Sequence, residues 1–162
     1  MTHNDPDVLI VGAGGSGLAA AVSCAQHGLS VLVLEACAEI GGTTGIAVGS
    51  FTASQSELQR KQGITDSPEQ HANDLTGFAP SQIEARNNST QRAFFTKHVA
   101  ETMNWLQALK IKFVGPVAEP PNRYPRMHNV IPGAKAYIAR LQIAAQKQGV
   151  EIRPNSTVTK LI

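Results

Sequence analysis

The sequence predicts an α/β fold built on a parallel sheet, and three observations favour this fold class. The first is a continuous apolar run at Val8–Val11, which is typical of a strand buried on both faces of a parallel sheet. The second is the glycine- and alanine-rich stretch that follows, which indicates a tight turn and then a helix. The third is another apolar run at 30–34. Strand, helix and strand therefore alternate, as in parallel α/β folds.

The first turn has the spacing G-x-G-x-x-G, at Gly12, Gly14 and Gly17. In such a turn the first glycine allows the sharp bend out of the strand, the second lets a pyrophosphate approach the backbone, and the third permits close packing of helix on strand. The helix that we expect at 15–27 ends at Gly28, a natural C-terminal cap. Its N-terminus would offer N–H groups and partial positive charge to phosphates.

An acidic residue, Glu35, follows the second expected strand. It lies 21 positions after Gly14, close to the ~20 expected for an acid that binds a ribose. Its carboxylate would accept hydrogen bonds from a ribose diol and repel a 2′-phosphate, which disfavours an NADP-like ligand. The alternative is a glycine-rich turn without a ligand. Strand, turn, helix, second strand and acid together give the context that a dinucleotide site requires.

A second glycine pair follows within the run Gly41-Gly42-Thr43-Thr44. With these residues the chain resembles the flavoprotein superfamily that includes fumarate reductase, the succinate dehydrogenase flavoprotein subunit, L-aspartate oxidase and 3-ketosteroid Δ1-dehydrogenase. In that family a Gly-Gly pair follows the ribose acid, and a segment of small residues, here 43–50, then runs beside the flavin ring. The resemblance implies FAD rather than NAD.

The resemblance implies two further features. Members with covalently attached flavin carry a His where this chain has Thr43, so the FAD is expected to be non-covalent. The helix at 133–148 and the strand at 150–153 match the segment that supplies the third parallel strand, which flanks the second in the order 3-2-1-4-5-6. In the family a residue after that strand contacts adenine through its backbone, and by position this is Val158.

The expected cofactor-binding residues are therefore Gly12, Gly14, Gly15, Ser16, Gly17, Glu35, Ala36, Gly41, Gly42, Thr43, Thr44, Gly49, Ser50 and Val158. We expect no metal site, because Cys24 and Cys37 lack a second pair or a suitably spaced His. The catalytic residues are unknown. Arg126 and His128 are weak candidates, since they lie in a cluster that could face an anionic or carbonyl substrate. The alternative is a solvated loop.

The remaining sequence predicts an excursion of helices and loops at 50–132, between the second and third strands of the parallel sheet. The family's later motifs are absent, and residues 157–162 look like the start of a further apolar strand. We therefore expect 1–162 to be the N-terminal part of a single FAD-binding domain with a Rossmann-like, incomplete fold. Within the excursion we expect helices at 54–62, from Ser67 onward and at 91–109.

Composition narrows the class of protein. Of the 162 residues, 42% are hydrophobic and 16% charged, as in a globular domain, and the net charge of +2 is too small to favour nucleic acid or acidic lipid. The polar start Met1–Asp7 is not a signal peptide. No apolar run approaches the ~18 residues that a membrane span needs. These features favour a cytoplasmic protein.

The resemblance implies the FAD-binding portion of a flavin-dependent oxidoreductase. Such an enzyme transfers a hydride at a C–C bond next to a carbonyl or carboxylate of a small-molecule substrate, and the electron donor or acceptor stays open. One alternative is an NAD-dependent dehydrogenase with the same fold. Another, if 162 residues are the full chain, is a non-catalytic nucleotide-binding module.

Overall fold

The computed structural model describes residues 5–161, which form two compact units. One unit is made by the chain up to Gly49 and from Pro132 onward, and the other by Ser50–Ile131. The first unit contains the glycine turn and the parallel sheet, and the second corresponds to the excursion expected at 50–132.

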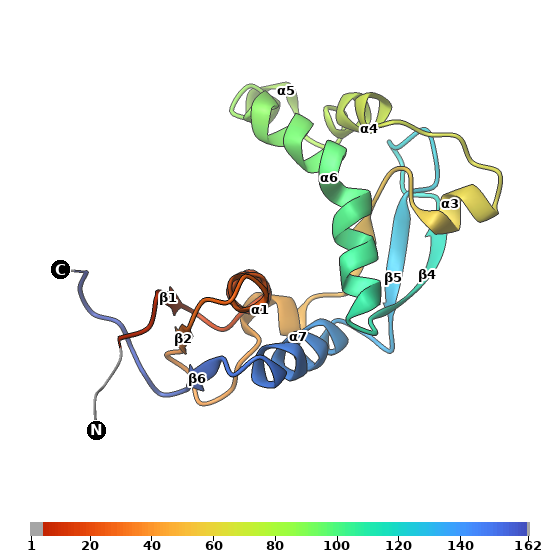
Figure 1. Ribbon diagram of the computed structural model, residues 1–162. Coiled ribbons are helices and arrows are strands. Elements are labelled where there is room, and N and C mark those ends of the chain that lie inside the picture. Colours follow the sequence, from red (N-terminus) through yellow and green to blue (C-terminus); the bar gives the residue numbers. More distant parts are fainter. Residues whose placement is uncertain (1–4, 162) are drawn as a thin grey trace. The chain divides into compact units, whose positions relative to one another are not determined.

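The first unit is built on a three-stranded parallel sheet with the order β1-β2-β6 (Figure 1). Its elements are, in chain order, β1 (Val8–Val11), α1 (Gly15–Gln26), β2 (Val31–Leu34), α2 (Gly42–Ile46), α7 (Lys135–Lys147) and β6 (Glu151–Arg153). Val31 pairs with Val8 on one side of β2, and Leu32 pairs with Glu151 on the other. The predicted parallel sheet, with the third parallel strand beside the second, is confirmed.

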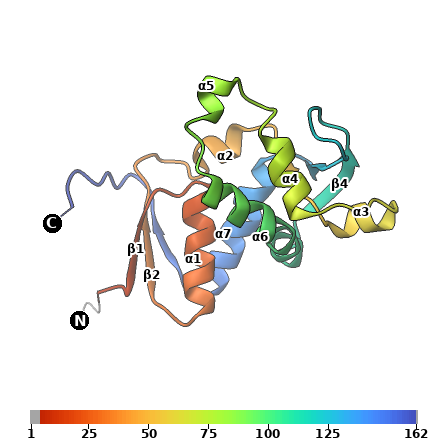
Figure 2. The same cartoon turned by 90° about the horizontal axis from the view of Figure 1, so that it is seen from above.

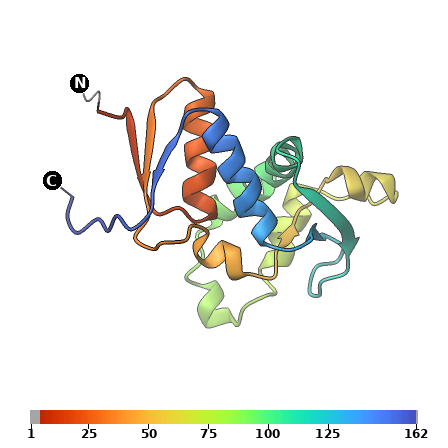
Figure 3. The same cartoon turned by 90° about the horizontal axis from the view of Figure 1, so that it is seen from below.

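Helices α1 and α7 lie side by side on one face of this sheet (Figure 3). The core lies between them and the strands, and it is lined by Leu18, Ala21 and Val22 of α1, by Tyr137, Ile138, Leu141 and Ala145 of α7, and by Val31 and Val33. On the other face, Leu9 and Val11 are 51% and 58% exposed. The expectation that β1 is buried on both faces is therefore wrong for this chain.

The second unit combines helices with an antiparallel sheet of order β3-β5-β4. Its elements are β3 (Ser50–Thr52), α3 (Glu57–Lys61), α4 (Pro68–Leu75), α5 (Ser81–Glu84), α6 (Ser89–Ala108), β4 (Lys112–Val117) and β5 (Met127–Ile131). Ser67 caps α4 as the sequence predicts, because its side chain accepts a hydrogen bond from the Gln70 amide. Helices α4 and α6 pack together (Figure 2).

One detail of the last residues differs from the sequence interpretation, and two details of the excursion are not evident from its sequence. Strand β4 continues through Gly115 and Pro116 and pairs with β5. In α6, Phe95 is 45% exposed, whereas Thr96 and Met103 are buried. Residues 157–161 form no strand. Ile162 and Met1–Asn4 lie outside the described residues.

Two findings concern residues 5–161 only. No helix among them is both long and apolar enough to cross a membrane. No three His, Cys, Asp or Glu side chains in this part of the chain are grouped so that they could hold a metal ion.

Candidate functional site

The glycine turn between β1 and α1 has the geometry that its spacing predicts at two of its three positions. Gly12 has a φ of +98°, a conformation that L side chains rarely adopt. A Cβ built on Gly17 would lie 1.9 Å from the Gly12 carbonyl oxygen. These two glycines are required by the chain itself, the first for the bend and the second for the contact between helix and turn.

Gly14 is different, because the chain itself does not require a glycine there. It is the N-cap of α1 with φ −77° and ψ −175°, which is extended backbone open to any residue. A Cβ built on Gly14 would meet only the Gly41 carbonyl oxygen, at 3.8 Å. As a glycine, the N-cap residue itself has no side chain to cap α1. The backbone at Gly14 therefore fits the close approach of a pyrophosphate.

The second glycine pair lies directly against this turn. The Gly41 amide donates to the Ala13 carbonyl at 2.9 Å, and Gly14 and Gly41 form an isolated parallel bridge. A Cβ built on Gly42 would lie 3.5 Å from the Gly14 Cα. The fold thus brings together the two motifs on which the prediction of FAD depends.

The two threonines after the pair have different surroundings. The Gly15 amide donates to the Thr44 hydroxyl at 3.3 Å, and a Cβ on Gly15 would lie 2.6 Å from that oxygen. Thr44 therefore packs on the first turn of α1, and its side chain leaves no room for a Cβ at position 15. Thr43 is exposed, as is Ser16 of α1.

Glu35 lies at the end of β2, and both of its carboxylate oxygens already bind the chain. Oε2 accepts the Ala13 amide at 2.7 Å, and Oε1 accepts the Cys37 amide at 2.9 Å. The hydrogen bond from Cys37, followed by the one from Ala13, lowers the pKa of Glu35, so the side chain is ionised at neutral pH. A carboxylate has about four acceptor positions, so the Ala13 and Cys37 amides leave room for a ribose hydroxyl. Sequence reasoning missed the bond that ties Glu35 to the glycine turn.

The segment after β6 lies alongside Glu35. The Ser156 amide donates to the Glu35 carbonyl at 2.7 Å, and the Asn155 amide donates to the Cys37 carbonyl at 3.1 Å. Val158 follows two residues later and is half-buried, and Ala36 is exposed beside Glu35. The structure therefore brings the chain on which the adenine contact is expected close to the expected ribose acid.

Gly49, the last but one residue of the small-residue segment 43–50, is buried and has a φ of +97°. The Tyr137 hydroxyl of α7 donates to the Gly49 carbonyl at 3.1 Å. Burial raises the pKa of Tyr137 to about 12, so the phenol keeps its proton. Ser50 begins β3 in the other unit, where its hydroxyl donates to Asn129. Sequence reasoning missed this bond, because no signal in the sequence links Tyr137 to Gly49.

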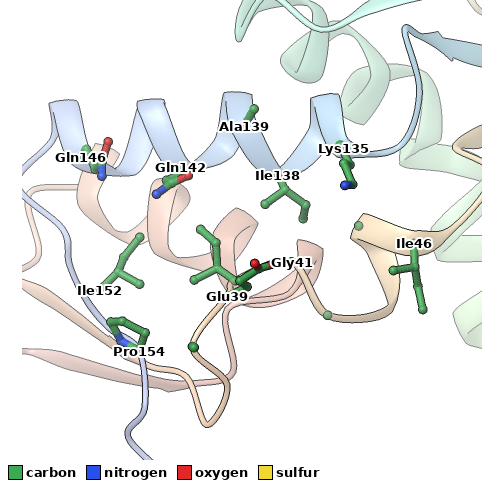
Figure 4. A pocket seen from close by; sticks show the side chains of 14 residues that line it. Glu39, Gly41, Ile46, Lys135, Ile138, Ala139, Gln142, Gln146, Ile152 and Pro154 are labelled. Atoms are coloured by element: carbon green, nitrogen blue, oxygen red, sulfur yellow. The ribbon is translucent and has the colours of Figure 1, made fainter.

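A cleft of about 680 Å³ lies between residues 38–46 and α7 (Figure 4). It is lined by Ala38, Glu39, Ile40, Gly41, Gly42, Gly45, Ile46, Lys135, Ile138, Ala139, Gln142, Gln146, Ile152 and Pro154. Of the expected cofactor residues, only Gly41 and Gly42 are among them. The glycine pair therefore lines the cleft and also contacts the turn at Gly14.

The weak catalytic candidates, Arg126 and His128, are fully buried in the second unit. Arg126 donates to both carboxylate oxygens of Asp66, at 2.7 and 2.8 Å, and to Asp74 at 2.7 Å. His128 Nδ1 lies 3.2 Å from the Phe51 carbonyl oxygen, and burial lowers its pKa. The alternative of a solvated loop is wrong for these two residues. Their contacts are those of a packed polar core.

Comparison with known proteins agrees with this geometry. A family model described as "FAD binding domain" matches residues 7–162. The chain is 32% identical over 107 residues to "Fumarate reductase (cytochrome)" of Shewanella frigidimarina, covering 66% of this chain and 18% of that protein. It is 31% identical over 113 residues to "3-oxosteroid 1-dehydrogenase" of Mycobacterium tuberculosis, covering 65% and 20%.

A solved structure has the same fold. The open conformation of a flavocytochrome c3 fumarate reductase matches with a TM-score of 0.88 and 26% identity, covering 97% of this chain and 28% of that chain. The chain therefore spans about a fifth of the two relatives' length and just over a quarter of the solved chain.

Proposed function

The chain belongs to the FAD binding domain family, and we propose that it is the FAD-binding part of an oxidoreductase that transfers a hydride at a C–C bond next to a carbonyl or carboxylate. Its cofactor is FAD. The observation that carries the proposal is the junction of Gly14, Gly41 and Glu35, where a helix N-terminus with a glycine N-cap, a glycine pair and an ionised acid meet. A single domain over 1–162, with 50–132 as its excursion, and a cytoplasmic location belong to the same proposal.

The chain's own residues would bind and orient the cofactor. The Gly14 backbone and the N-terminus of α1 would hold the pyrophosphate, because N–H groups and partial positive charge meet there. The Glu35 carboxylate would also accept a hydrogen bond from the adenosine ribose, and its charge would repel a 2′-phosphate. The exposed side of 43–49 would lie along the flavin. When bound, FAD supplies the redox chemistry.

The reaction class is supported by the names of the relatives. Fumarate carries its double bond between two carboxylates, and 1-dehydrogenation of a 3-oxosteroid places a double bond beside a ketone. Both are two-electron changes at an activated C–C bond of a small molecule. We propose a substrate of this class and an electron partner that the described residues do not identify.

Ligand titration of the purified chain tests the binding half of the proposal. We expect one FAD per chain, no measurable competition by NAD, and competition by ADP, which shares the adenosine and pyrophosphate. Binding of NAD in preference to FAD would favour the dehydrogenase alternative.

Anaerobic reoxidation of the dithionite-reduced, FAD-loaded oxidoreductase of which this chain is the FAD-binding part tests the reaction. We expect fumarate or a 1,4-diene-3-oxosteroid to reoxidise the protein faster than an unconjugated alkene does. Reoxidation no faster than that of free reduced FAD by every conjugated acceptor would leave the chain as a binding module and overturn the proposed activity.

A further inference from the structure

Residues 41–49, which include the stretch expected to lie along the flavin, are held by three hydrogen bonds to other parts of the first unit. At the start of this segment, the Gly41 amide donates to the Ala13 carbonyl at 2.9 Å. In its middle, the Thr44 hydroxyl accepts the Gly15 amide at 3.3 Å. At its end, the Gly49 carbonyl accepts the Tyr137 hydroxyl at 3.1 Å. The first two bonds are to the phosphate-binding turn, but the third is to α7.

Two neighbouring residues of α7, Tyr137 and Ile138, contact opposite ends of residues 41–49. The side chain of Ile138 would lie 3.5 Å from a Cβ on Gly41 and 3.7 Å from one on Gly45, so it fills the space beneath these glycines. Tyr137 holds Gly49, which is buried in a conformation with positive φ. Between these points Ile46 and Val48 are 85% and 87% exposed. These two exposed side chains therefore lie on the stretch that is expected to face the flavin ring.

We propose that Tyr137 is a positioning residue, which fixes the backbone of residues 45–49 for the flavin ring through its hydrogen bond to the Gly49 carbonyl. The inference rests on the proposed function, since it assigns that segment to the flavin. Tyr137 is only 8% exposed, and a buried phenol that keeps its proton is a permanent donor. Without this donor a buried carbonyl would lose its partner. The backbone of residues 45–49 would then be free to move at its Gly49 end.

The variant Tyr137→Phe removes the hydroxyl and keeps the ring. We expect the Kd for FAD to rise roughly fivefold, which corresponds to about 1 kcal/mol for one hydrogen bond. The Kd for ADP should stay within twofold, because ADP has no flavin and its contacts are at Gly14 and Glu35. The visible absorption band of the bound flavin should also shift. The control is Tyr124→Phe in the second unit, the same change at the chain's other tyrosine, which should alter none of these.

Hydrogen–deuterium exchange of the ligand-free chain gives a second readout. In Tyr137→Phe the amides of residues 45–49 should exchange several-fold faster, while those of α1 keep the wild-type rate. Equal losses of FAD and ADP affinity, or unchanged FAD affinity with unchanged exchange, would overturn the positioning role. Failure of the wild-type chain to bind FAD is a different result, because it would overturn the proposed function itself.

Discussion

Glu35 is expected to act twice, on the ligand and on the turn that binds it. Its two oxygens accept the Ala13 and Cys37 amides at 2.7 and 2.9 Å, and the same carboxylate is expected to bind the ribose. Glu35→Ala removes all of these hydrogen bonds. Because hydrogen bonds to a charged group contribute about 1.5–3 kcal/mol each, and less where water can replace them, we expect the free energy of unfolding to fall by about 2 kcal/mol.

The effect on ligand binding should be larger than one contact alone would give. Loss of a ribose bond of about 1.5–3 kcal/mol weakens binding by roughly ten- to 100-fold, and loosening of Ala13 adds to this. Calorimetric titration should show FAD and ADP affinity falling together, and urea unfolding should give the stability change. Glu39→Ala, an exposed glutamate four residues further on, is the control and should keep FAD affinity.

Two results would refute this reasoning about Glu35. If Glu35→Ala unfolds at the wild-type urea concentration, the carboxylate does not hold the turn. If FAD affinity is unchanged while stability falls, the ribose lies elsewhere and Glu35 is only a structural residue.

Three further predictions concern other parts of the chain. Acid precipitation should release all the FAD into the supernatant, because Thr43 stands where covalent members of the resembled family carry His; yellow colour in the pellet would contradict this. Arg126→Met should destabilise the second unit by about 3–5 kcal/mol, since it leaves buried Asp66 without a cationic partner and leaves Asp74 with Arg123 alone. Urea unfolding followed by the fluorescence of Trp105, the single tryptophan, measures this loss, and a loss below about 1 kcal/mol would refute the prediction. Burial, followed by the charge of Arg126, lowers the pKa of His71 from 6.5 to about 4. As the pH falls from 6.5 to about 4, the unfolded chain therefore binds a proton at this histidine that the folded chain does not bind. Stability should then decrease by about 3 kcal/mol from this group, and His71→Asn should show a shallower decrease between pH 7 and 4.5; equal slopes would count against it.

Much of the cofactor site could be predicted because its chemistry is encoded locally. The spacing of Gly12, Gly14 and Gly17 fixes a turn whose requirements are steric, and the 1.9 Å approach at Gly17 shows one of them directly. The junction between this turn and the Gly41-Gly42 pair is not local. It was nevertheless implied by the resemblance, because both motifs are expected at one ligand.

The excursion could be predicted less well, because long-range packing decides it. Arg126 and His128 looked like solvent-facing residues, since charged side chains are rarely buried without partners. The partners of Arg126 are Asp66 and Asp74, which lie 60 and 52 positions away. His128 Nε2 lies 2.8 Å from the hydroxyl of Ser56, which is 72 positions away. No periodic pattern links these residues. The antiparallel pairing of β3 with β5 likewise joins residues nearly 80 positions apart, such as Ser50 and Asn129.

The exposed face of β1 shows a third limit. A continuous apolar run predicts burial on both faces, but it does not say what covers each face. In this chain α1 and α7 cover one face, and Leu9 and Val11 remain exposed on the other.

The most direct test of the central claim is the FAD affinity of Gly14→Ala. The chain tolerates a Cβ there, since φ is −77° and the nearest atom is 3.8 Å away. Gly133→Ala is the matched control, because a Cβ at Gly133 meets nothing within 4 Å. The account predicts that Gly14→Ala unfolds within about 1 kcal/mol of the wild type, while its Kd for FAD rises at least tenfold and the control keeps wild-type affinity. Wild-type FAD affinity in a folded Gly14→Ala chain would contradict the account, because the pyrophosphate could not then lie on this turn.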